Sequence, residues 1–562
     1  MSRTVFIVLL CAFLLAVGFL LGRRSREDGR SLTAGVPASQ SFRSEAAQAS
    51  RKPPLKKDEA AAPVSASYQG SEESGASSEK LENDGQNNGN AYLEGELILR
   101  PKEGVSMAQL IAFLKEKGIA VIGDIPELGL VRVVLPDDLS VPQAEKFLKG
   151  KDEIADTVRN APVSLDPLPN DPSSLAQARP VGSSALRMMS VDESGTFRNG
   201  DGILVAVLDT GVDETHPALA GQTISGYDFV NDMAYQKDLN GHGTACASLI
   251  AGRGGENISG TAPMAKILPV KVMDDKGKSD GFSVAQGIIY AVKKGAKIIN
   301  MSLGTSSETN LLDEALNYAM DHDCLVVAAS GNEGKEGENY PANLEGVLCV
   351  GAVDGEKWKA PFSNYGSKVD LVAPGVFVAA ASLNGGTVLM SGTSSAAPLI
   401  SGAAASLWSE NPNWSASLVA EKLMAEADDL GSPGADDWYG SGLVNLHRAR
   451  RKTQENDMAL TSLYFDPPNL VQGQSVTMVA VFQNQGTERV SDGSAIIKVD
   501  SKTKEILLPA LDPGASCEVR EDLALPEGRA KREMYLEVKV ETKRTEARLD
   551  NNGQRIVISE RK

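Results

Sequence analysis

Short aliphatic runs alternate with amphipathic segments between residues 170 and 450, and this alternation limits the possible folds more than any other feature. The run from Ile203 to Leu208 is almost continuously aliphatic and ends at Asp209. Such a run is typical of a strand that is covered on both faces, as in a parallel sheet. Similar runs recur at 267–272, 298–303, 325–329 and 347–353. Residues 282–294 lie between two of these runs and carry apolar side chains at helical spacing. The pattern predicts an α/β fold with a doubly wound parallel sheet over residues 169–452.

The region before this sheet, residues 92–168, has a different pattern. Two strands and two short helices predict a small β-α-β-β-α-β unit of ferredoxin-like α+β type. In the helix predicted over 107–117, Ile111 is expected to face inward together with its apolar neighbours. In the helix predicted over 142–150, we expect the same of Phe147.

The two ends of the chain differ again. Residues 458–560 contain short alternating strands separated by turn residues, which predicts an all-β sandwich. Residues 25–91 carry few large apolar side chains and cannot bury enough surface to offset the entropy of ordering, so they are predicted to be a disordered linker. Residues 1–24 include an uncharged apolar stretch, which predicts either a cleaved signal peptide or a signal anchor that stays in the membrane.

Charge and cysteine content exclude some classes of function. The formal net charge of −18 argues against nucleic-acid binding, which needs clustered Lys and Arg. No two of the five cysteines stand at the spacing of a metal site, and no disulfide framework is implied. Cys324 and Cys349 lie at apolar runs and are expected to be buried in the core, with a disulfide between them as the alternative.

Three short motifs carry residues suited to nucleophilic catalysis. Asp209 ends the first aliphatic run within Asp-Thr-Gly, and His242 opens a predicted helix within Gly-His-Gly-Thr. Ser394 opens another predicted helix within Gly-Thr-Ser-Ser-Ala-Ala-Pro. Acyl transfer by serine needs a hydroxyl, a base within hydrogen-bond reach and a carboxylate that orients the base. The three motifs predict a catalytic triad, with backbone N–H groups at a helix N-terminus beside Ser394.

In the order Asp, His, Ser, these motifs resemble those of the subtilisin family, or subtilases, over about residues 170–450. A fourth motif, residues 330–334 with the sequence Ser-Gly-Asn-Glu-Gly, resembles the family loop whose asparagine donates to the oxyanion. The resemblance therefore implies that Asn332 and the backbone N–H of Ser394 stabilise the oxyanion.

The resemblance also implies how a substrate binds. An extended peptide would add as a strand against Ser302, Leu303 and Gly304 and against a segment near 279–281. The walls of the pocket for the residue before the cleaved bond would include Ala328, Ala329 and Gly331. Glu333 at the rim of this pocket either favours a basic or polar residue there or has no role in specificity.

Residues outside the triad motifs refine the resemblance. Residues 92–168 resemble the family's inhibitor-type propeptide, which assists folding and then blocks the cleft; a permanent domain with another role is the alternative. Cys246 lies one helical turn beyond His242 and is expected to pack under the imidazole, as in the proteinase K branch, or to be inert core. The sandwich resembles the bacterial adhesion-type module called CARDB.

The turn around His216 bears on metal binding. Ala218 stands where many subtilisins carry a calcium-ligating carboxylate, and His216 in the same turn is expected to be structural. We therefore expect no metal ligands among the site residues and no cofactor. A structural calcium ion is possible, but this position does not support it.

These observations predict a serine endopeptidase made as an autoinhibited precursor. Its expected partners are protein or peptide substrates and its own propeptide, with a possible membrane anchor, in an extracytoplasmic location that is either membrane-anchored or secreted. The alternative is a non-catalytic surface or binding protein that keeps the fold. The four intact positions, Asp209, His242, Ser394 and Asn332, count against that alternative.

Overall fold

The computed structural model describes residues 92–558 except 167–174, 176–177, 192–198, 235–236, 256–257, 306–309, 452–454, 468–474, 526–533, 547 and 550. The predicted signal or anchor at 1–24 and the predicted linker at 25–91 lie outside the described residues. Within the described ranges, no helix is both long and apolar enough to cross a membrane.

The first described domain is an antiparallel sheet with two helices. Its strands lie in the order β2-β3-β1-β4. The elements in chain order are β1 (Glu96–Pro101), α2 (Met107–Glu116), β2 (Ala120–Ile125), β3 (Leu130–Val134), α3 (Val141–Leu148) and β4 (Ile154–Val158). The expected β-α-β-β-α-β order is confirmed.

Both helices of this domain begin with a serine followed three residues later by a glutamine. The Ser106 side chain accepts from the backbone of Gln109, whose side chain accepts from the backbone of Ser106. Ser140 and Gln143 stand at the equivalent positions before α3, and the Gln143 side chain likewise accepts from the backbone N–H of Ser140. This reciprocal capping satisfies N–H groups that a helix start leaves without partners.

Two expectations about the inward faces of these helices are wrong. Leu110 and Leu114 of α2 are buried, but Ile111 is 43% exposed. Residues four apart share a face of a helix, and Ile111 lies about 100° around the helix from Leu110, at the edge of that face. Phe147 of α3 is 38% exposed, and the ammonium group of Lys151 lies over its ring.

The central domain is built on an eight-stranded sheet in the order β16-β15-β14-β13-β6-β11-β7-β8. All neighbouring strands from β16 to β7 are parallel, and β8 pairs antiparallel at the edge. The strands are β6 (Leu204–Asp209), β7 (Tyr227–Asp228), β8 (Met233–Ala234), β11 (Lys266–Lys271), β13 (Ile298–Met301), β14 (Leu325–Ala329), β15 (Leu348–Val353) and β16 (Leu371–Pro374). The sheet confirms the predicted doubly wound α/β fold.

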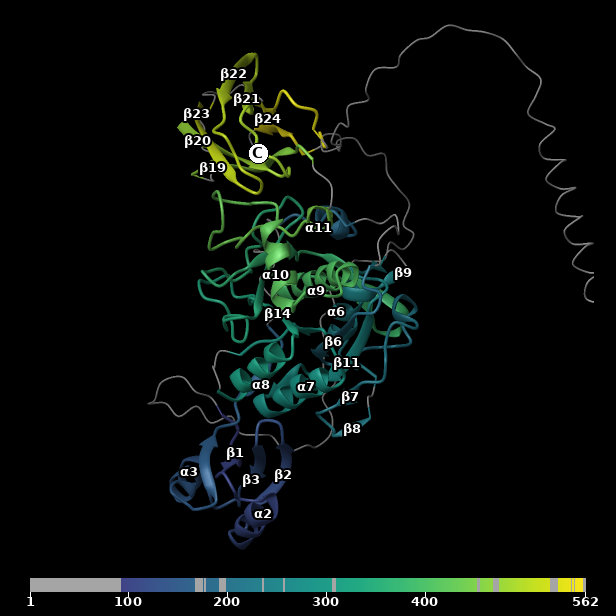
Figure 1. Ribbon diagram of the computed structural model, residues 1–562, viewed down its shortest axis with the longest axis vertical. Coiled ribbons are helices and arrows are strands. Elements are labelled where there is room, and N and C mark those ends of the chain that lie inside the picture. Colours follow the sequence, from purple (N-terminus) through teal and green to yellow (C-terminus); the bar gives the residue numbers. More distant parts are fainter. Residues whose placement is uncertain are drawn as a thin grey trace, which may run out of the picture. The chain divides into compact units, whose positions relative to one another are not determined.

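Helices cover both faces of this sheet (Figure 1). On one face lie α6 (His242–Ala251), α9 (Thr393–Glu410) and α10 (Ala416–Ala425), and on the other lie α7 (Gly281–Lys293) and α8 (Asn310–Asp321). Val205 and Val207 of β6 enter the first core, whereas Ala206 and Leu208 enter the second. Two covered faces explain why the run that ends at Asp209 is aliphatic at every position.

Smaller elements complete the central domain. They are α5 (Ala185–Met188), β9 (Arg253–Gly255), β10 (Ile258–Ser259), β12 (Lys278–Asp280), β17 (Val378–Ser382), β18 (Gly386–Met390), α11 (Leu446–Arg450) and two 3₁₀ turns at Pro217–Leu219 and Leu383–Gly385. Between the first and central domains, β5 (Pro162–Ser164) pairs with β12.

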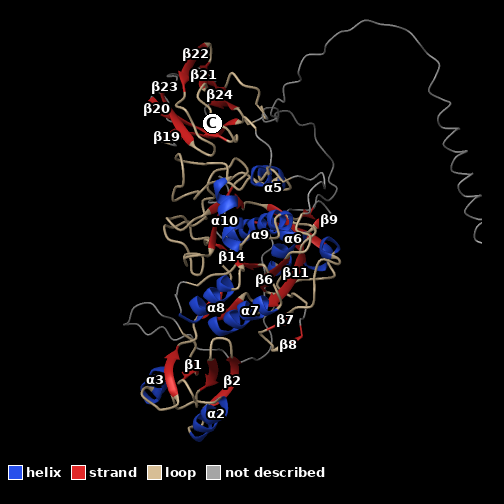
Figure 2. Cartoon of the chain, in the orientation of Figure 1, coloured by secondary structure: helices blue, strands red, loops and turns tan. Residues whose placement is uncertain are grey.

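The last domain consists of two small antiparallel sheets (Figure 2). One contains β19 (Met458–Asp466), β20 (Ser475–Asn484) and β23 (Ser516–Ala524). The other contains β21 (Ser494–Val499), β22 (Lys502–Leu507), β24 (Met534–Glu541) and β25 (Gly553–Ile558). Alternate residues of facing strands, such as Phe482 and Leu536, share one apolar core, which confirms the expected all-β sandwich.

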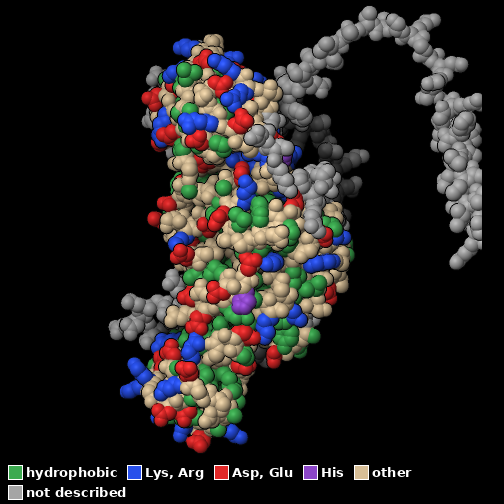
Figure 3. All heavy atoms as spheres, viewed as in Figure 1, with side chains coloured by type: hydrophobic (Ala, Val, Ile, Leu, Met, Phe, Trp, Pro, Cys, Tyr) green, Lys and Arg blue, Asp and Glu red, His purple; other side chains and the backbone are tan. Residues whose placement is uncertain are grey.

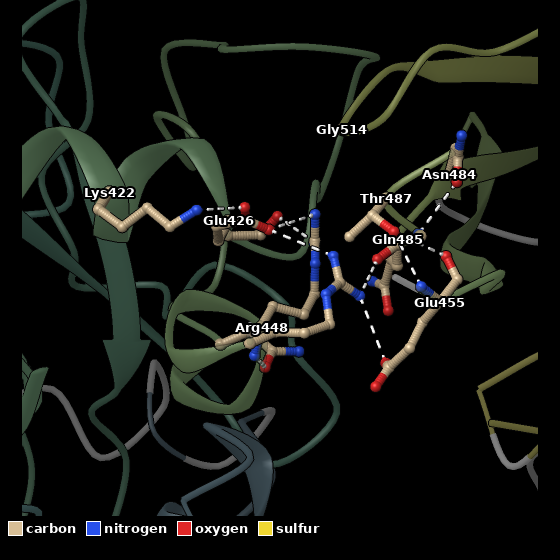
Figure 4. A network of polar contacts seen from close by, with 12 residues as sticks. Lys422, Glu426, Arg448, Glu455, Asn484, Gln485, Thr487 and Gly514 are labelled. Atoms are coloured by element: carbon tan, nitrogen blue, oxygen red, sulfur yellow. Dashed lines mark hydrogen bonds and ion pairs between the residues drawn. The ribbon is translucent and has the colours of Figure 1, made fainter. Parts of the chain in front are cut away.

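A buried polar network joins the central domain to this sandwich (Figure 4). Arg448 of α11 is 2% exposed and donates to the carbonyl of Ala427 at 2.9 Å and to Oε1 of Gln483 on β20 at 3.1 Å. Its guanidinium also lies 3.5 Å from Glu426 and 3.6 Å from Asp428. We call this set of contacts the sandwich joint.

On the face shown in Figure 3, acidic and basic side chains are interspersed and do not gather by sign. The cysteines of the described residues are free, and Cys246, Cys324 and Cys349 are buried, as expected for the last two. In an open parallel sheet, functional residues lie at the carboxyl ends of the strands.

Candidate active site

Asp209 and His242 form a buried pair where β6 ends and α6 begins. Nδ1 of His242 lies 2.9 Å from both carboxylate oxygens of Asp209, and the carboxylate also accepts from the backbone N–H of Thr210 at 2.7 Å. Burial acts to lower the pKa of His242, but the negative charge of Asp209 and the contact with Cys246 raise that pKa well above its ordinary value. The pair therefore stabilises the positive charge that the imidazole gains when it accepts a proton.

A second buried carboxylate, Asp238, fixes the start of α6. One oxygen accepts from the backbone N–H of Gly241 at 2.9 Å and from Thr210 Oγ1 at 3.0 Å. The other accepts from the N–H and hydroxyl of Thr244. Sequence reasoning missed Asp238, although an acid just before a predicted helix start is a known capping signal. It ties the end of β6 to α6 and so positions His242.

Ser394 lies in the first turn of α9, next to an asparagine amide whose orientation is fixed. Oδ1 of Asn332 accepts from the backbone N–H of Thr393 at 2.8 Å and from its hydroxyl at 2.9 Å. Nδ2 of Asn332 is buried and has no partner among the described residues. A Cβ on Gly392 would stand 3.2 Å from this nitrogen, at a residue with φ of +143°. The loop thus holds a buried donor ready for an acceptor beside Ser394.

Cys246 connects the two halves of the site. Its sulfur lies 3.8 Å from Nδ1 of His242 and 3.6 Å from the carbonyl oxygen of Ser394, which confirms that it packs under the imidazole. Burial raises the pKa of the Cys246 thiol. One side chain in contact with both residues puts His242 and Ser394 in the same small region. The ligand atoms of Asp209, His242 and Cys246 also lie within 4.8 Å of one another, but the Asp209 carboxylate already engages Nδ1.

The predicted substrate-binding strands enclose a segment of the chain itself. Ser164 on β5 donates to the carbonyl of Gly304 at 3.2 Å and accepts from its N–H at 3.0 Å, while β5 pairs on its other side with β12. The next residue, Leu165, donates to the carbonyl of Gly277 at 2.9 Å. The end of the first domain therefore lies in the cleft as an extended strand.

The other residues predicted to bind substrate are buried or lie in a tight turn. Leu303 is buried, and Ser302 is buried with its hydroxyl 3.4 Å from the carbonyl of Ser394. Ala328 and Ala329 at the end of β14 are buried in opposite cores, and Gly331 follows them with φ of +111°. A side chain on Gly331 would collide with the amides of two asparagines.

Those two asparagines, Asn339 and Asn364, were missed from the sequence. Nδ2 of Asn364 donates to Glu333 at 2.7 Å, and Nδ2 of Asn339 lies 3.2 Å from both oxygens of Glu333. Neither asparagine belongs to a local motif, so no sequence signal identified them.

At the turn considered for calcium, His216 has a structural role, as expected. Its Nδ1 accepts from the backbone N–H of Ala218 at 3.1 Å, and its Nε2 lies 2.9 Å from the carbonyl of Gly386. Ala218 is buried and brings no side-chain oxygen to the turn.

A serine at a helix N-terminus, an Asp–His pair at the ends of parallel strands and a free amide donor define a serine hydrolase on an α/β scaffold. Comparison with known proteins gives the family. Residues 200–442 match the Subtilase family, and residues 78–161 match the Fervidolysin N-terminal prodomain.

Thermitase from Thermoactinomyces vulgaris is 37% identical over 283 residues, which are 50% of this chain and 98% of thermitase. A thermophilic serine proteinase from Bacillus sp. (strain AK1) is 35% identical over 362 residues, or 64% of this chain and 88% of that protein. The chain belongs to the subtilase family and is a serine endopeptidase with an N-terminal prodomain, made as a zymogen.

The crystal structure of fervidolysin from Fervidobacterium pennivorans, described as a keratinolytic enzyme related to subtilisin, has a similar fold. The TM-score is 0.57 at 20% sequence identity, with 81% of this chain and 90% of that chain covered.

Proposed function

We propose that Ser394 is the nucleophile of this endopeptidase, with His242 as its base and Asp209 as the group that orients the base. His242 takes the Ser394 proton during attack on a peptide carbonyl and returns it to the leaving amine. The proposal rests on the 2.9 Å pairing of His242 with Asp209 next to the start of α9, where Cys246 contacts both halves of the site.

Asn332 and the backbone N–H of Ser394 serve as the oxyanion donors. The support is the buried Nδ2 of Asn332, which finds no acceptor in the described part of the chain. A donor held in this way needs no reorganisation when negative charge develops on the substrate oxygen.

Substrate peptides bind as an added strand against Ser302, Leu303 and Gly304, with Ala328, Ala329 and Gly331 walling the pocket before the cleaved bond. The pairing of Ser164 with Gly304 supports this, because it has the geometry of a bound peptide. In the precursor, the strand around Ser164 inhibits the enzyme by occupying the cleft.

The remaining regions receive coarser roles. Residues 1–24 direct the precursor across a membrane, as a cleaved signal or an anchor, and 25–91 form a linker to the prodomain at 92–168. The catalytic domain spans 169–452, and the CARDB-like sandwich at 458–560 binds a surface or a substrate. We also propose that the turn of Ala218 holds no strong calcium site, because Ala218 brings no side-chain oxygen to it.

The direct test is to incubate the purified full chain with casein and with a fluorophosphonate that labels active serines. Wild type should hydrolyse casein and be labelled, and Ser394→Ala should do neither. Ser395→Ala is a matched control, because the hydroxyl of Ser395 is buried without a partner in the described residues. If wild type is not labelled after prodomain removal, the chain is a binding protein that only keeps the fold.

A further inference from the structure

Asp166, two residues beyond the Ser164 pairing, lies in a buried site beside Asn339 and Gly304, which we call the pocket. The side chain of Asp166 is almost fully buried, and its Oδ1 accepts from Nδ2 of Asn339 at 3.1 Å. A Cβ on Gly304 would stand 2.7 Å from this oxygen. Asp166 is also near enough to His242 for the imidazole to act on its pKa. Asp166 thus takes the position of the residue before a cleaved bond.

The groups around this side chain provide one hydrogen-bond donor and one acceptor. The donor is Nδ2 of Asn339, and the acceptor is the carboxylate of Glu333, which contacts the same amide at 3.2 Å. The second oxygen of Asp166, Oδ2, is buried and unpartnered within the described ranges. The pocket therefore provides a hydrogen-bond partner for only one of the two carboxylate oxygens of Asp166.

A primary amide would find hydrogen-bond partners for both its oxygen and its nitrogen. Its oxygen would accept from Asn339, and its nitrogen would donate in the direction of Glu333, where the carboxylate of Asp166 has nothing to donate. We propose that Asn339 and Glu333 make this enzyme cleave preferentially after asparagine. The inference rests on the proposed function and deepens it, because it names the substrate class of the same site.

Alternatives fit the pocket less well. An aromatic or a basic side chain has no acceptor for the Nδ2 of Asn339, so either would leave this donor without the bond that Asp166 accepts. The donor on Asn339 argues against the basic preference that Glu333 alone suggests.

Aspartate fits only when it carries a proton. Burial raises the pKa of Asp166 to about 7, the bond from Asn339 lowers it, Glu333 raises it, and His242 and Lys335 lower it. A neutral carboxyl group can donate to Glu333 as an amide does. The ratio of cleavage after aspartate to cleavage after asparagine should therefore fall as pH rises from about 4 to 7.

The test uses the processed full chain and peptides Val-Ser-Leu-X-nitroanilide, whose first three residues copy Val163 to Leu165. At pH 8, kcat/KM for X = Asn should exceed that for Asp, Ala, Phe or Lys by about tenfold or more, as one or two added hydrogen bonds allow. Equal or faster cleavage after Phe or Lys would overturn the proposal. Fluorophosphonate labelling in the same samples separates this failure from an inactive Ser394.

Two variants assign the preference to residues. Asn339→Ala should lower kcat/KM for the Asn peptide about tenfold and leave the Ala peptide unchanged; an equal loss on both would mean a structural role and contradict the proposal. Glu333→Gln should improve cleavage after Asp at pH 8, because the repulsion is removed. Glu336→Gln, at an exposed acid on the same loop, is the matched control. It should change neither the kcat/KM ratio of the Asn peptide to the Ala peptide nor that of the Asp peptide to the Asn peptide.

Discussion

The catalytic domain has two joints, which hold charge in different ways. We call the contacts between the first and central domains the prodomain joint. In it, Ile98, Ile125 and Leu130 share an apolar core with Phe282, whereas ion pairs such as Arg100 with Glu314 and Lys293 with Glu127 join partly exposed side chains. The sandwich joint centres on Arg448, which is 2% exposed and contacts residues of both domains. Exposed pairs contribute little and are screened by salt, whereas a buried charge that loses its partners is strongly destabilising. The charged contacts of the first joint should therefore contribute less to stability than those of the second.

In the cleft, the backbone and the side chain of the prodomain strand also differ in how completely they are hydrogen-bonded. Ser164 pairs with Gly304 as a substrate would, but Asp166 leaves one buried oxygen without a partner in the described structure. The inhibitory strand is therefore well ordered along its backbone and imperfect at the pocket. An occupant that fits imperfectly can block the cleft and still be displaced.

The largest expected effect is on the removal of the prodomain, which depends on Ser394. Ser394→Ala should reduce peptide-bond hydrolysis by more than about 10⁴-fold, so the prodomain stays covalently attached. Mass spectrometry of the purified chain should find one uncut species that retains residues 92–166. Removal of the prodomain from this variant in the absence of other proteases would mean that Ser394 does not process the chain.

The next effect is on the sandwich joint. Arg448→Met removes the buried guanidinium that contacts Glu426 and Asp428. Because these carboxylates keep contacts with Lys422 and Asn445, the free energy of unfolding should fall by about 3 kcal/mol, the lower end of the range for a broken buried pair. Urea unfolding measured in the Ser394→Ala background, which prevents autolysis, checks this. A change below about 1 kcal/mol would mean that the two joints do not differ in strength.

A smaller effect is expected from pH at the pocket. Because the pKa of Asp166 is raised from 3.8 to about 7, docking of the strand is strongest when this carboxyl is protonated and weakens as pH rises from about 4 to 7. Urea unfolding of the Ser394→Ala chain should therefore show a free energy of unfolding that falls over this pH range by about 1–3 kcal/mol more than in the same chain carrying Asp166→Asn. The difference between the two chains removes the titration of His242. A difference that stays constant with pH would exclude Asp166 as the cause.

The smallest effect concerns the exposed ion pairs. Lys293→Gln removes the contact with Glu127 and should change the free energy of unfolding of the Ser394→Ala chain by less than about 1 kcal/mol. Adding salt should have a similarly small effect on the free energy of unfolding of the Ser394→Ala chain. A loss as large as that of Arg448→Met would remove the distinction between the joints.

Much of this protein follows from local sequence. The aliphatic run before Asp209 predicts a strand covered on both faces, and the glycine-flanked motifs around His242 and Ser394 predict the helix starts that bear them. These features can be predicted from the sequence because strand burial and helix capping depend on neighbouring residues. The oxyanion loop with Asn332 was found in the same way, through a short motif.

Only the tertiary structure decided which distant side chains meet. Asn339 and Asp166 are 173 positions apart and come together because β5 inserts between Gly304 and β12. The inward faces of α2 and α3 were also decided by the sheet on which they pack, so Ile111 was wrongly placed inside. Local rules fix the elements and the catalytic motifs of this chain, whereas its pocket and its joints depend on packing between segments whose pairing no short pattern encodes.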